Sequence, residues 1–339
     1  MTCSPTLASL DVVTVTLNPA LDDSFSVPRL VPGSKMRGSS PRFDPGGGGI
    51  NVARVLHVLG VPTLAVFPTA GHIGRALTEL LESERLPFAG IEVPGETRLS
   101  HHVTEIDTGL EYRFVLPGTP LSPFDLDRCL ETVKREGHHA AYVVLSGSLP
   151  PGVSADVVPR VRCLSDAIGA RLVVDASGGA LAQAHGAYLI KPSVRELEEH
   201  LGRALDSLEE QLAGARELLT ETRAAIVVLS RGHLGVALVT PRRTQLLPAV
   251  GGNLVSGVGA GDALVAGTIA GLVHGWEPSR ATRLGLACSA AMIETAGTSI
   301  FSRDDLIPFT DDFLDHSYGG KFQTESPCPD AAEQRKVKL

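Results

Sequence analysis

Residues 256–275 read SGVGAGDALVAGTIAGLVHG, a glycine-rich turn that leads directly into an apolar segment with helical periodicity. Outside its apolar stripe the predicted helix holds mostly alanine and glycine, so it can pack very closely against its neighbours. At its start, the backbone N–H groups of Gly259, Ala260 and Gly261 are expected to point to one place. Such a nest, strengthened by the helix dipole, is suited to bind an anion.

Asp262 places a carboxylate in the first turn of the same helix. As a plain helix cap it would stabilise the helix and need no further role. A cap, however, does not require two glycines with one small residue between them immediately before it. An anion hole beside a carboxylate suits phosphoryl transfer, because the nest steadies the moving phosphoryl group and the carboxylate takes the proton of the attacking hydroxyl. We therefore favour a catalytic role for Asp262.

A second glycine run, PGGGGIN at residues 45–51, precedes the apolar segment VARVLHVLG. Residues 50–59 are predicted to form a buried helix that ends at Gly60. The glycines let a ligand approach closely, and N–H groups at the helix start can hold hydroxyl or phosphate oxygens. Asn51 either caps the helix or offers its amide to a substrate hydroxyl, and a flexible loop without a ligand explains the run equally well. The run is neither a Walker A motif nor the G-x-G-x-x-G dinucleotide fingerprint.

Apolar runs typical of strands alternate along the chain with segments of helical periodicity. This alternation indicates crossover units and a mostly parallel sheet with helices on both faces. The predicted fold class is therefore α/β. The strand-like runs are residues 12–17, 63–67, 141–145, 172–174 and 226–229.

Two stretches break this rhythm. One is rich in proline and glycine, and the other reads as two strands joined by a turn at residues 107–109. We interpret them as a small β-sheet that could act as a lid and exclude water, with a surface excursion of no function as the alternative. The predicted organisation is an α/β domain at residues 10–21, 46–96 and 118–317, a lid at 22–45 and 97–117, and a disordered tail at 318–339.

The composition of the 339-residue chain is that of a folded protein with a sizeable core, with 43% hydrophobic and 20% charged residues. Its formal charge of −8 argues against nucleic acid or a membrane surface as a partner. No apolar run approaches the roughly 18 residues that span a bilayer, and the first residues lack the features of a secretory signal. The five cysteines are scattered and form no C-x-x-C pair. We expect a cytoplasmic enzyme that acts on small molecules.

Together, the two glycine-rich segments give the chain a resemblance to the ribokinase-like (PfkB) carbohydrate kinase family. The resemblance runs from about residue 16 to residue 305 and is strongest to the 6-phosphofructokinase branch. It implies a three-layer α/β/α fold with a mostly parallel central sheet, a β-sheet lid that commonly pairs to form a homodimer, ATP as co-substrate, and Mg²⁺. The motifs that carry it are TLNPALD, PGGGGINVAR, EYRFVLPG, SGSLPPG, SGVGAGDALVAG and AGTSIFSRDD.

By this resemblance, Asp262 matches the family's catalytic base, and residues 259–261 match its anion hole. Asp22, in TLNPALD, matches the acid that binds sugar hydroxyls, although a turn residue is its plainer interpretation. The same sugar site would be lined by Gly47, Gly48 and Asn51.

Gly48 is the third position of the glycine run. Related 1-phosphofructokinases and tagatose-6-phosphate kinases usually have lysine there. The glycine therefore favours fructose 6-phosphate as the substrate.

The phosphate of the substrate is expected to sit against basic residues of the lid. Lys35, Arg37 and Arg98 are expected on the lid strands, where they would supply donors to a group of about two negative charges. Arg113, in EYRFVLPG, is either a further phosphate ligand or a plain surface charge. Ser148, in SGSLPPG, follows a buried strand and would lie near the sugar, with a local turn as the alternative.

The nucleotide side is predicted from three short motifs. Lys191 ends a predicted strand and could reach the ATP phosphates. Glu196 matches the acid of the family's N-x-x-E motif, which organises Mg²⁺ through waters, but Ser193 replaces the asparagine. The turn beneath the nucleotide matches Ser230, Gly232 and Gly235.

The leading hypothesis is ATP-dependent phosphorylation of the 1-hydroxyl of fructose 6-phosphate, the glycolytic reaction that gives fructose 1,6-bisphosphate and ADP. Tagatose 6-phosphate and fructose 1-phosphate are alternative substrates. A catalytically silent sugar-phosphate sensor is the alternative from another class, favoured by Ser193 and disfavoured by Asp262. A nucleoside or ribose kinase would leave the basic residues of the lid without a phosphate. An oxidoreductase would need the dinucleotide fingerprint, which is absent.

Overall fold

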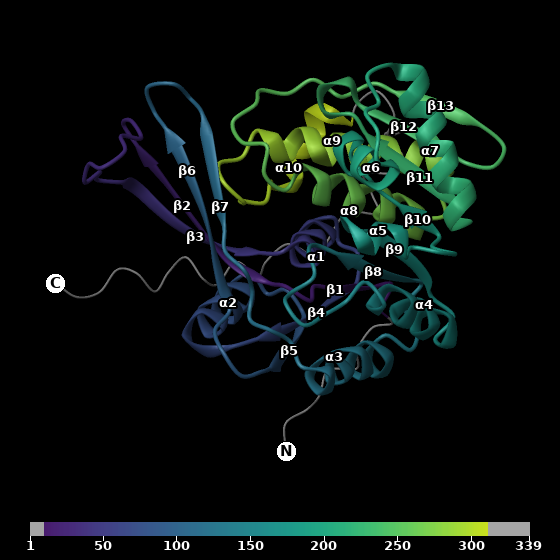
Figure 1. The fold of residues 1–339 in the computed structure, drawn as a ribbon, viewed down its shortest axis with the longest axis horizontal. Coiled ribbons are helices and arrows are strands. Elements are labelled where there is room, and N and C mark those ends of the chain that lie inside the picture. The colour runs from purple at the N-terminus through teal and green to yellow at the C-terminus, as the bar shows by residue number, and fades with distance from the viewer. Residues whose placement is uncertain (1–9, 311–339) are drawn as a thin grey trace, which may run out of the picture.

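The computed structural model describes residues 10–310, which form two sheets and the helices that cover the larger one (Figure 1). The large sheet has the strand order β13-β12-β11-β10-β9-β8-β1-β4-β5. All pairs from β11 to β5 are parallel, which confirms the predicted fold class, and β12 and β13 add an antiparallel edge. The bounds are β1 (Val12–Val15), β4 (Thr63–Thr69), β5 (Phe88–Glu92), β8 (Tyr142–Ser146), β9 (Arg171–Asp175), β10 (Leu189–Ile190), β11 (Ile226–Ser230), β12 (Val236–Val239) and β13 (Thr244–Leu247).

Helices bury both faces of this sheet and complete three layers. The central strands carry side chains of Val, Leu and Ile to both faces, and these are almost completely buried. One face is covered by α3 (Pro123–Glu136), α4 (Val157–Ala167), α5 (Gly179–Ala182), α6 (Val194–Leu201) and α7 (Leu208–Thr222). The other is covered by α1 (Gly48–Val58), α8 (Ala260–Val273), α9 (Pro278–Ile293) and α10 (Arg303–Leu306), with α2 (Gly71–Ser83) beside α1.

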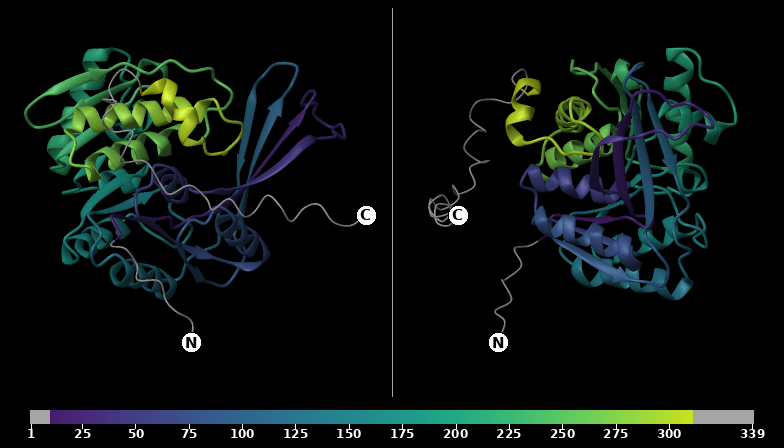
Figure 2. Two further views of the ribbon diagram at one scale, coloured as in Figure 1. Left: turned by 180° about the vertical axis from the view of Figure 1, so that it is seen from behind. Right: turned by 90° about the vertical axis from the view of Figure 1, so that its left-hand side faces the viewer.

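The small sheet has the order β3-β2-β6-β7 and extends from the body as an arm (Figures 1 and 2). Its strands are β2 (Ala20–Val27), β3 (Ser39–Gly46), β6 (Arg98–Glu105) and β7 (Glu111–Val115). Residues 106–110 link β6 to β7, so the turn predicted at 107–109 is confirmed. We call this sheet the lid. The tail predicted at residues 318–339 lies outside the described residues.

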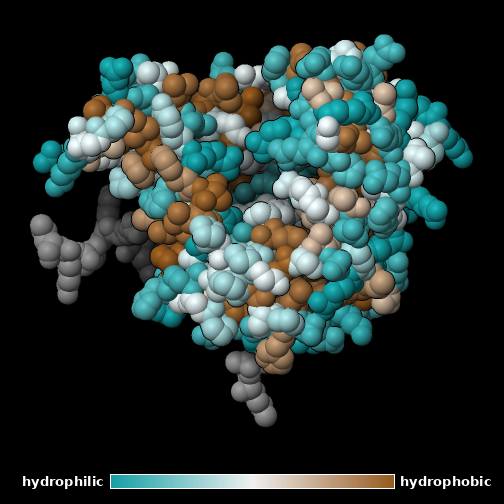
Figure 3. All heavy atoms as spheres, in the orientation of Figure 1, coloured by the Kyte–Doolittle hydropathy of each residue, from teal (hydrophilic) through white to brown (hydrophobic). Residues whose placement is uncertain are grey.

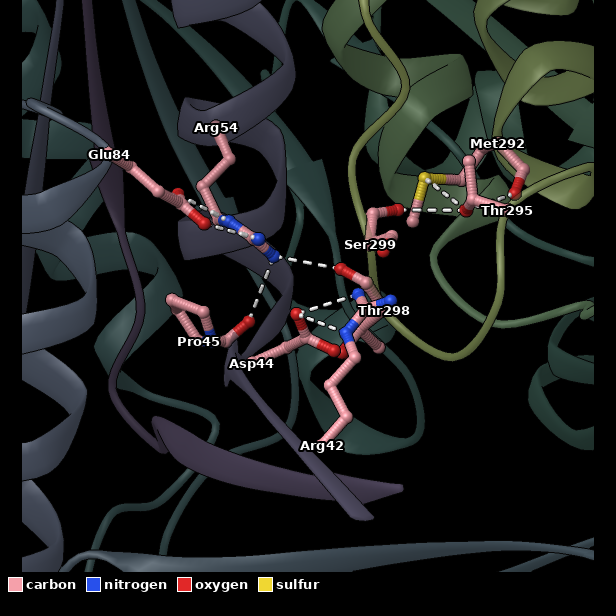
Figure 4. A network of polar contacts seen from close by, with 9 residues as sticks. All are labelled: Arg42, Asp44, Pro45, Arg54, Glu84, Met292, Thr295, Thr298 and Ser299. Carbon is pink, nitrogen blue, oxygen red and sulfur yellow. Dashed lines mark hydrogen bonds and ion pairs between the residues drawn. The ribbon is translucent and has the colours of Figure 1, made fainter. Parts of the chain in front are cut away.

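A buried arginine of α1 joins the base of the lid to the body (Figure 4). The Arg54 guanidinium is bidentate to the Glu84 carboxylate, with N–O distances of 2.8 and 2.6 Å. It also donates to the carbonyl oxygens of Pro45 on β3 and Thr298 in the loop after α9. Arg54 is only 4% exposed, and this contact set satisfies its charge, so it fixes four segments relative to one another.

Among residues 10–310, no helix is both long enough and apolar enough to cross a bilayer.

Helices α8 and α9 pack at van der Waals distance because glycines face each other. A Cβ atom on Gly267 would lie 2.7 Å from the Cα of Gly285 and 2.8 Å from the carbonyl oxygen of Leu284. Both obstacles are backbone atoms, which cannot move aside by a rotamer change. The small residues that the sequence placed along this helix are therefore needed for its packing.

We expect Gly267→Ala to lower the free energy of unfolding by about 1–3 kcal/mol through overpacking, despite the better helix propensity of alanine. Chemical denaturation monitored by circular dichroism measures it. Gly251→Ala is the matched control, because a Cβ there meets no atom within 4 Å, and it should change stability by less than about 0.5 kcal/mol. Equal effects of the two changes would contradict the packing argument.

Candidate active site

Most of the predicted residues gather at the carboxyl ends of the parallel strands, beside the point where the strand order reverses. From β1 the chain first adds β4 and β5 on one side, and only later β8 to β11 on the other. Ligands of open α/β sheets bind at such a switch point. Here α1 begins so close to the end of β8 that a Cβ on Gly48 would lie 2.8 Å from the backbone nitrogen of Gly147. The surface is hollowed between the lid and the body (Figure 3).

A hydrogen bond between two helix starts forms the centre of this site. The Asn51 side-chain amide, in the first turn of α1, donates to the Asp262 carboxylate on α8 at 2.9 Å. This bond fixes the amide with its nitrogen toward Asp262, so the Asn51 carbonyl oxygen points away. That oxygen is buried and has no hydrogen-bond partner within the described chain. The site therefore offers an unused acceptor beside a carboxylate.

Asp262 is a carboxylate with the protonation behaviour of a general base. Burial in the protein, together with the negative charge of Asp175, raises its pKa from the ordinary 3.8 to about 7. Asn51, Lys191 and Arg113 oppose the shift without cancelling it. A base with a pKa near neutrality combines a useful ionised fraction with the strength to accept a proton.

The turn before α8 has the backbone geometry that its glycines predict. Gly259, the N-cap residue, has a φ of 76°, and a Cβ there would lie 2.7 Å from the Met292 side chain. Helix α8 begins at Ala260, so the N–H groups of residues 259–261 belong to the N-cap and first turn, where the helix itself provides no acceptor. They lie immediately before Asp262 in the chain.

Lys191 and Asp175 form a buried ion pair below the start of α8. The Lys191 ammonium lies 3.0 Å from the Asp175 carboxylate, and both side chains are less than 10% exposed. Burial alone would lower the pKa of Lys191, but Asp175, Glu196 and Asp262 outweigh it and raise that pKa, so the lysine stays charged. A Cβ on Gly261 would lie 3.4 Å from the ammonium, which places the cation beside the glycine-rich turn before Asp262.

Asp175 was not among the site residues predicted from the sequence. The available signal was its place in LVVDASGG, as the polar residue that ends a buried parallel strand at the ligand-binding edge. Nothing in the local pattern, however, indicated that Lys191 would be its partner.

Glu196 is held by the residue that replaces asparagine in the family motif. Its carboxylate accepts hydrogen bonds from the backbone N–H and the hydroxyl of Ser193, at 2.7 and 2.9 Å, and the Ser193 hydroxyl accepts from the Glu196 N–H. This capping box starts α6 and fixes the orientation of Glu196. The negative charge of Glu196 contributes to the raised pKa of Lys191.

The turn after β11 lies beside this cap. The Ser230 N–H donates to the Pro192 carbonyl oxygen at 2.8 Å, and Ser230 bridges to Ser193. Gly232 and Gly235 have φ values of 59° and 84°, and a Cβ on Gly235 would lie 2.5 Å from the nitrogen of Ala249. The predicted nucleotide-side residues Lys191, Glu196, Ser230, Gly232 and Gly235 therefore come from adjoining segments.

On the sugar side, Asp22 lies on β2 and is only 5% exposed. Gly46 pairs with Ala20 on the same strand, and any Cβ on Gly46 would overlap the Asp22 carboxylate. Gly47 has a φ of 112°, which favours glycine, and a Cβ there would lie 2.8 Å from the Thr16 methyl group. The glycine run is thus required by close contacts and is not a flexible loop. Ser148 is exposed and accepts a hydrogen bond from Asn18 at the same strand edge.

Arg98 begins β6 at the base of the lid. One guanidinium nitrogen donates to the Asn18 carbonyl oxygen at 3.2 Å, while Nε and Nη1 are buried without a partner among the described residues. Burial lowers its pKa, and Asp22 opposes this effect. Arg113 on β7 influences the pKa values of both Arg98 and Asp262, so its charge lies near both. Unpartnered buried donors of a guanidinium are costly unless an anion binds them.

The expectation that Lys35 and Arg37 lie on the lid strands is wrong. Both are exposed in the loop of residues 28–38, between β2 and β3 at the tip of the lid. Arg98 pairs with Ala20, and the seven residue intervals from there to Val27 span about 23 Å at about 3.3 Å per residue. Proline and glycine in this segment favour a loop over a continued ladder. Within one chain, these two cations and Arg98 therefore do not form one cluster.

Comparison with known proteins agrees with this geometry. Residues 7–305 match the pfkB family carbohydrate kinases. The chain belongs to this family. It is 45% identical over 299 residues to the ATP-dependent 6-phosphofructokinase isozyme 2 of Mycobacterium tuberculosis, with 88% of each chain covered. It is also 34% identical to a 1-phosphofructokinase of Bacillus subtilis, with 86% of this chain and 95% of that protein covered.

This PfkB kinase is similar to a solved structure, that of phosphofructokinase-2 from Escherichia coli in complex with fructose-6-phosphate. The TM-score is 0.82 at 32% identity, and the match covers 88% of this chain and 98% of that chain. The ribokinase-like three-layer fold with a second, smaller sheet, expected from the sequence, is thereby confirmed.

The residues present fit a magnesium ion that is bound mainly through nucleotide phosphates and water. Residues 10–310 contain no cluster of three His, Cys, Asp or Glu side chains able to enclose a metal. They do bring the Asp175 and Glu196 carboxylates to one cation, Lys191. Mg²⁺ in phosphoryl-transfer sites is commonly held by one or two carboxylates together with substrate phosphates, which this arrangement can supply.

The raised pKa of Asp262 predicts a cost in stability. Between its ordinary pKa of 3.8 and the folded value of about 7, the folded protein binds the proton more tightly, so ionisation destabilises it as the pH rises. We expect Asp262→Asn to raise the free energy of unfolding at pH 8 by up to about 4 kcal/mol, since each pKa unit corresponds to about 1.4 kcal/mol. The gain should shrink as the pH falls toward 4.

Urea denaturation at several pH values measures this difference. Glu131→Gln on α3 is the control, because it removes an exposed carboxylate on a helix that covers the face of the sheet opposite α8. A gain of the same size in both variants would indicate a general charge effect and contradict the cost assigned to Asp262.

Proposed function

We propose that this PfkB kinase transfers the γ-phosphoryl group of ATP to the 1-hydroxyl of fructose 6-phosphate, giving fructose 1,6-bisphosphate and ADP. The observation that carries the proposal is the pair of buried, unpartnered nitrogens of Arg98 at the base of the lid. They would be satisfied by the phosphate that the substrate already carries. A cytoplasmic location and a place in glycolysis belong to the same proposal.

Asp262 acts as the general base. In its ionised form it accepts the proton of the 1-hydroxyl while that oxygen attacks the γ-phosphorus and the bond to the β-phosphate oxygen breaks. Asn51 holds the carboxylate in position, and its unpartnered oxygen accepts a hydrogen bond from a sugar hydroxyl. Asp22 binds further sugar hydroxyls beside Gly47 and Gly48. The transfer is in line and forms no covalent enzyme intermediate.

The N–H groups of Gly259, Ala260 and Gly261 stabilise the charge on the moving phosphoryl group. They are fixed before the reaction by the helix start, so no reorganisation is needed when charge develops. Lys191 binds the ATP phosphates from the side of Asp175, and the turn of Ser230, Gly232 and Gly235 supports the nucleotide. When bound, Mg²⁺ would neutralise phosphate charge, with Glu196 and Asp175 as its nearest carboxylates.

Gly48 supports fructose 6-phosphate over fructose 1-phosphate. A Cβ at this position would overlap the Ser146 hydroxyl and approach the Gly147 nitrogen, so the lysine usual in 1-phosphofructokinases and tagatose-6-phosphate kinases has no room here. Those two reactions remain the alternative assignments for the same machinery.

We also propose that the lid pairs with the lid of a second copy. Register places Phe43, Asp23, His101 and Phe114 in one row across the lid face opposite Asp22. Phe43 and Phe114 are 52% and 51% exposed, and apolar surface is visible on the lid in Figure 3. A sheet with one face polar toward the site and the other apolar is suited to burial against a partner. In such a dimer, Lys35 and Arg37 could reach the substrate phosphate of the other subunit.

The first test is ADP release with Mg-ATP and fructose 6-phosphate, fructose 1-phosphate or tagatose 6-phosphate. We expect the highest kcat/KM on fructose 6-phosphate, rising with pH through about 7 as Asp262 ionises. Asp262→Asn should lower kcat by roughly 10²–10⁴-fold, the usual contribution of a general base. Arg98→Leu should raise KM for the phosphosugar and leave KM for ATP unchanged.

Turnover that prefers another phosphosugar would keep the machinery and overturn the substrate. If sugar phosphate binds but no substrate turns over, the silent sensor becomes the better assignment. An Arg98→Leu variant with unchanged KM for the phosphosugar would remove the observation on which the substrate proposal depends.

For the dimer, we expect Phe43→Ser combined with Phe114→Ser to convert the protein to monomers in sedimentation velocity experiments. The wild type should sediment as a dimer because the row buries two phenylalanines against their counterparts. Leu254→Ser, which changes an exposed apolar residue outside the lid, is the control and should leave the dimer intact. A monomeric wild type would contradict pairing through the lid.

A further inference from the structure

A second concave site lies at the amino end of β11, whereas Asp262 lies at the carboxyl ends of the parallel strands. A cavity of about 580 Å³ opens between the end of α7 and the turn that joins β12 to β13. Four arginines line it, namely Arg216 and Arg223 from α7 and Arg242 and Arg243 from the turn. Ala224, at its floor, precedes β11, whose other end carries Ser230 of the active site. The four intervals along β11 alone separate the two sites by about 13 Å.

No carboxylate of residues 10–310 lines this cavity. The side chains that accompany the arginines are apolar or threonine. On α7 the positions three and four residues from Arg216 hold alanine, leucine and threonine, so no ion pair along the helix can form. Two glutamates of α7, Glu217 and Glu221, are engaged elsewhere, with Arg203 and His200. Within residues 10–310, none of the four arginines has a carboxylate within ion-pair distance.

Local geometry fixes the cations at the rim. Arg216 Nε donates to the Thr244 hydroxyl at 3.1 Å, which holds the helix side against the hairpin side. Two hydrogen bonds close the turn: the Thr240 N–H donates to the Arg243 carbonyl oxygen, and the Arg243 N–H donates to the Thr240 hydroxyl. Arg242 and Arg243 therefore lie at its tip. Arg223 ends α7 with a φ of 54°, a left-handed conformation usually taken by glycine or asparagine.

The negative end of the α7 dipole does not account for this set. That field favours a cation in the last turn and falls off within it, so it explains Arg223 but not Arg216, nearly two turns earlier. The two arginines of the turn belong to another element altogether. In a chain of net charge −8, four cations without a counter-charge around one cavity repel one another.

We propose that this cavity binds the polyphosphate group of a small molecule. Its volume falls within the roughly 300–1,000 Å³ typical of small-ligand sites. Guanidinium groups bind phosphate oxygens in pairs, and the Thr244 hydroxyl, which accepts from Arg216, can donate to a further oxygen. Leu219 and Ala224 form an apolar floor on which a ring could rest, so either a free polyphosphate or a nucleoside triphosphate fits this chemistry.

The test uses the full-length protein, with inorganic tripolyphosphate, ATP and adenosine as probes at low ionic strength. Hydrogen–deuterium exchange locates binding, and calorimetry measures affinity. We expect tripolyphosphate to protect peptides that cover residues 216–225 and 240–244. Arg242→Gln combined with Arg243→Gln should remove this protection and weaken the affinity of this site at least tenfold. The kinase activity measured without added polyphosphate should not change. Arg216→Gln provides a second variant on the helix side.

The control combines Arg75→Gln with Arg283→Gln, two exposed arginines on α2 and α9, and alters the net charge equally. It should keep the protection and bind within twofold of wild type. ATP that protects the same peptides more strongly than tripolyphosphate would identify a nucleotide, and equal protection would identify the free polyphosphate chemistry. Protection confined to the segments around Asp262, or equal losses in both double variants, would overturn the proposal.

Discussion

The hydrogen bond between Asn51 and Asp262 sets the arrangement of this molecule, because it joins two helix starts that are 211 residues apart in the chain. The bond forms only if α1 and α8 direct their N-termini at the same point on the sheet edge. That requirement explains the glycines before each helix, since any Cβ at Gly48 or Gly259 would strike a neighbouring segment. Farther along α8, Gly267 allows equally close packing against α9, where larger side chains would not fit.

Two clusters of buried charge differ in how completely their charges are paired. Arg54 is fully paired with Glu84 and two carbonyl oxygens, so its burial fixes the lid base with no unsatisfied group on the guanidinium. Around Lys191, by contrast, three carboxylates share one cation, and the pKa of Asp262 is raised as a result of burial and of Asp175. In this second cluster, carboxylates outnumber the one lysine, so the charges are not balanced within the cluster. Such imbalance is expected where a protein must bind phosphates and move a proton.

The lid separates polar from apolar character by strand alternation alone. Asp22, Ser100, His102 and Arg113 occupy one set of alternating register positions, and the row of Phe43 and Phe114 occupies the other. A shift of register by one residue would exchange the faces, so the lid ladder must be specified strongly. Arg54 and the Gly46–Asp22 contact fix its base, where register matters for the site.

The sequence determined the fold class, the helix starts and the roles open to Asp262 and Asn51, because strand periodicity and glycine-rich turns are local properties of the chain. Lys35 and Arg37 were predicted on strands, but the ladder between β2 and β3 does not include the proline- and glycine-rich segment that holds them. The sequence did not select Asp175, and it could not pair Asp175 with Lys191 or Arg54 with Glu84. Those contacts depend on which strands and helices become neighbours, and the strand order is settled by packing of the whole sheet. Tertiary structure alone also decided that four arginines from α7 and a distant hairpin surround one cavity.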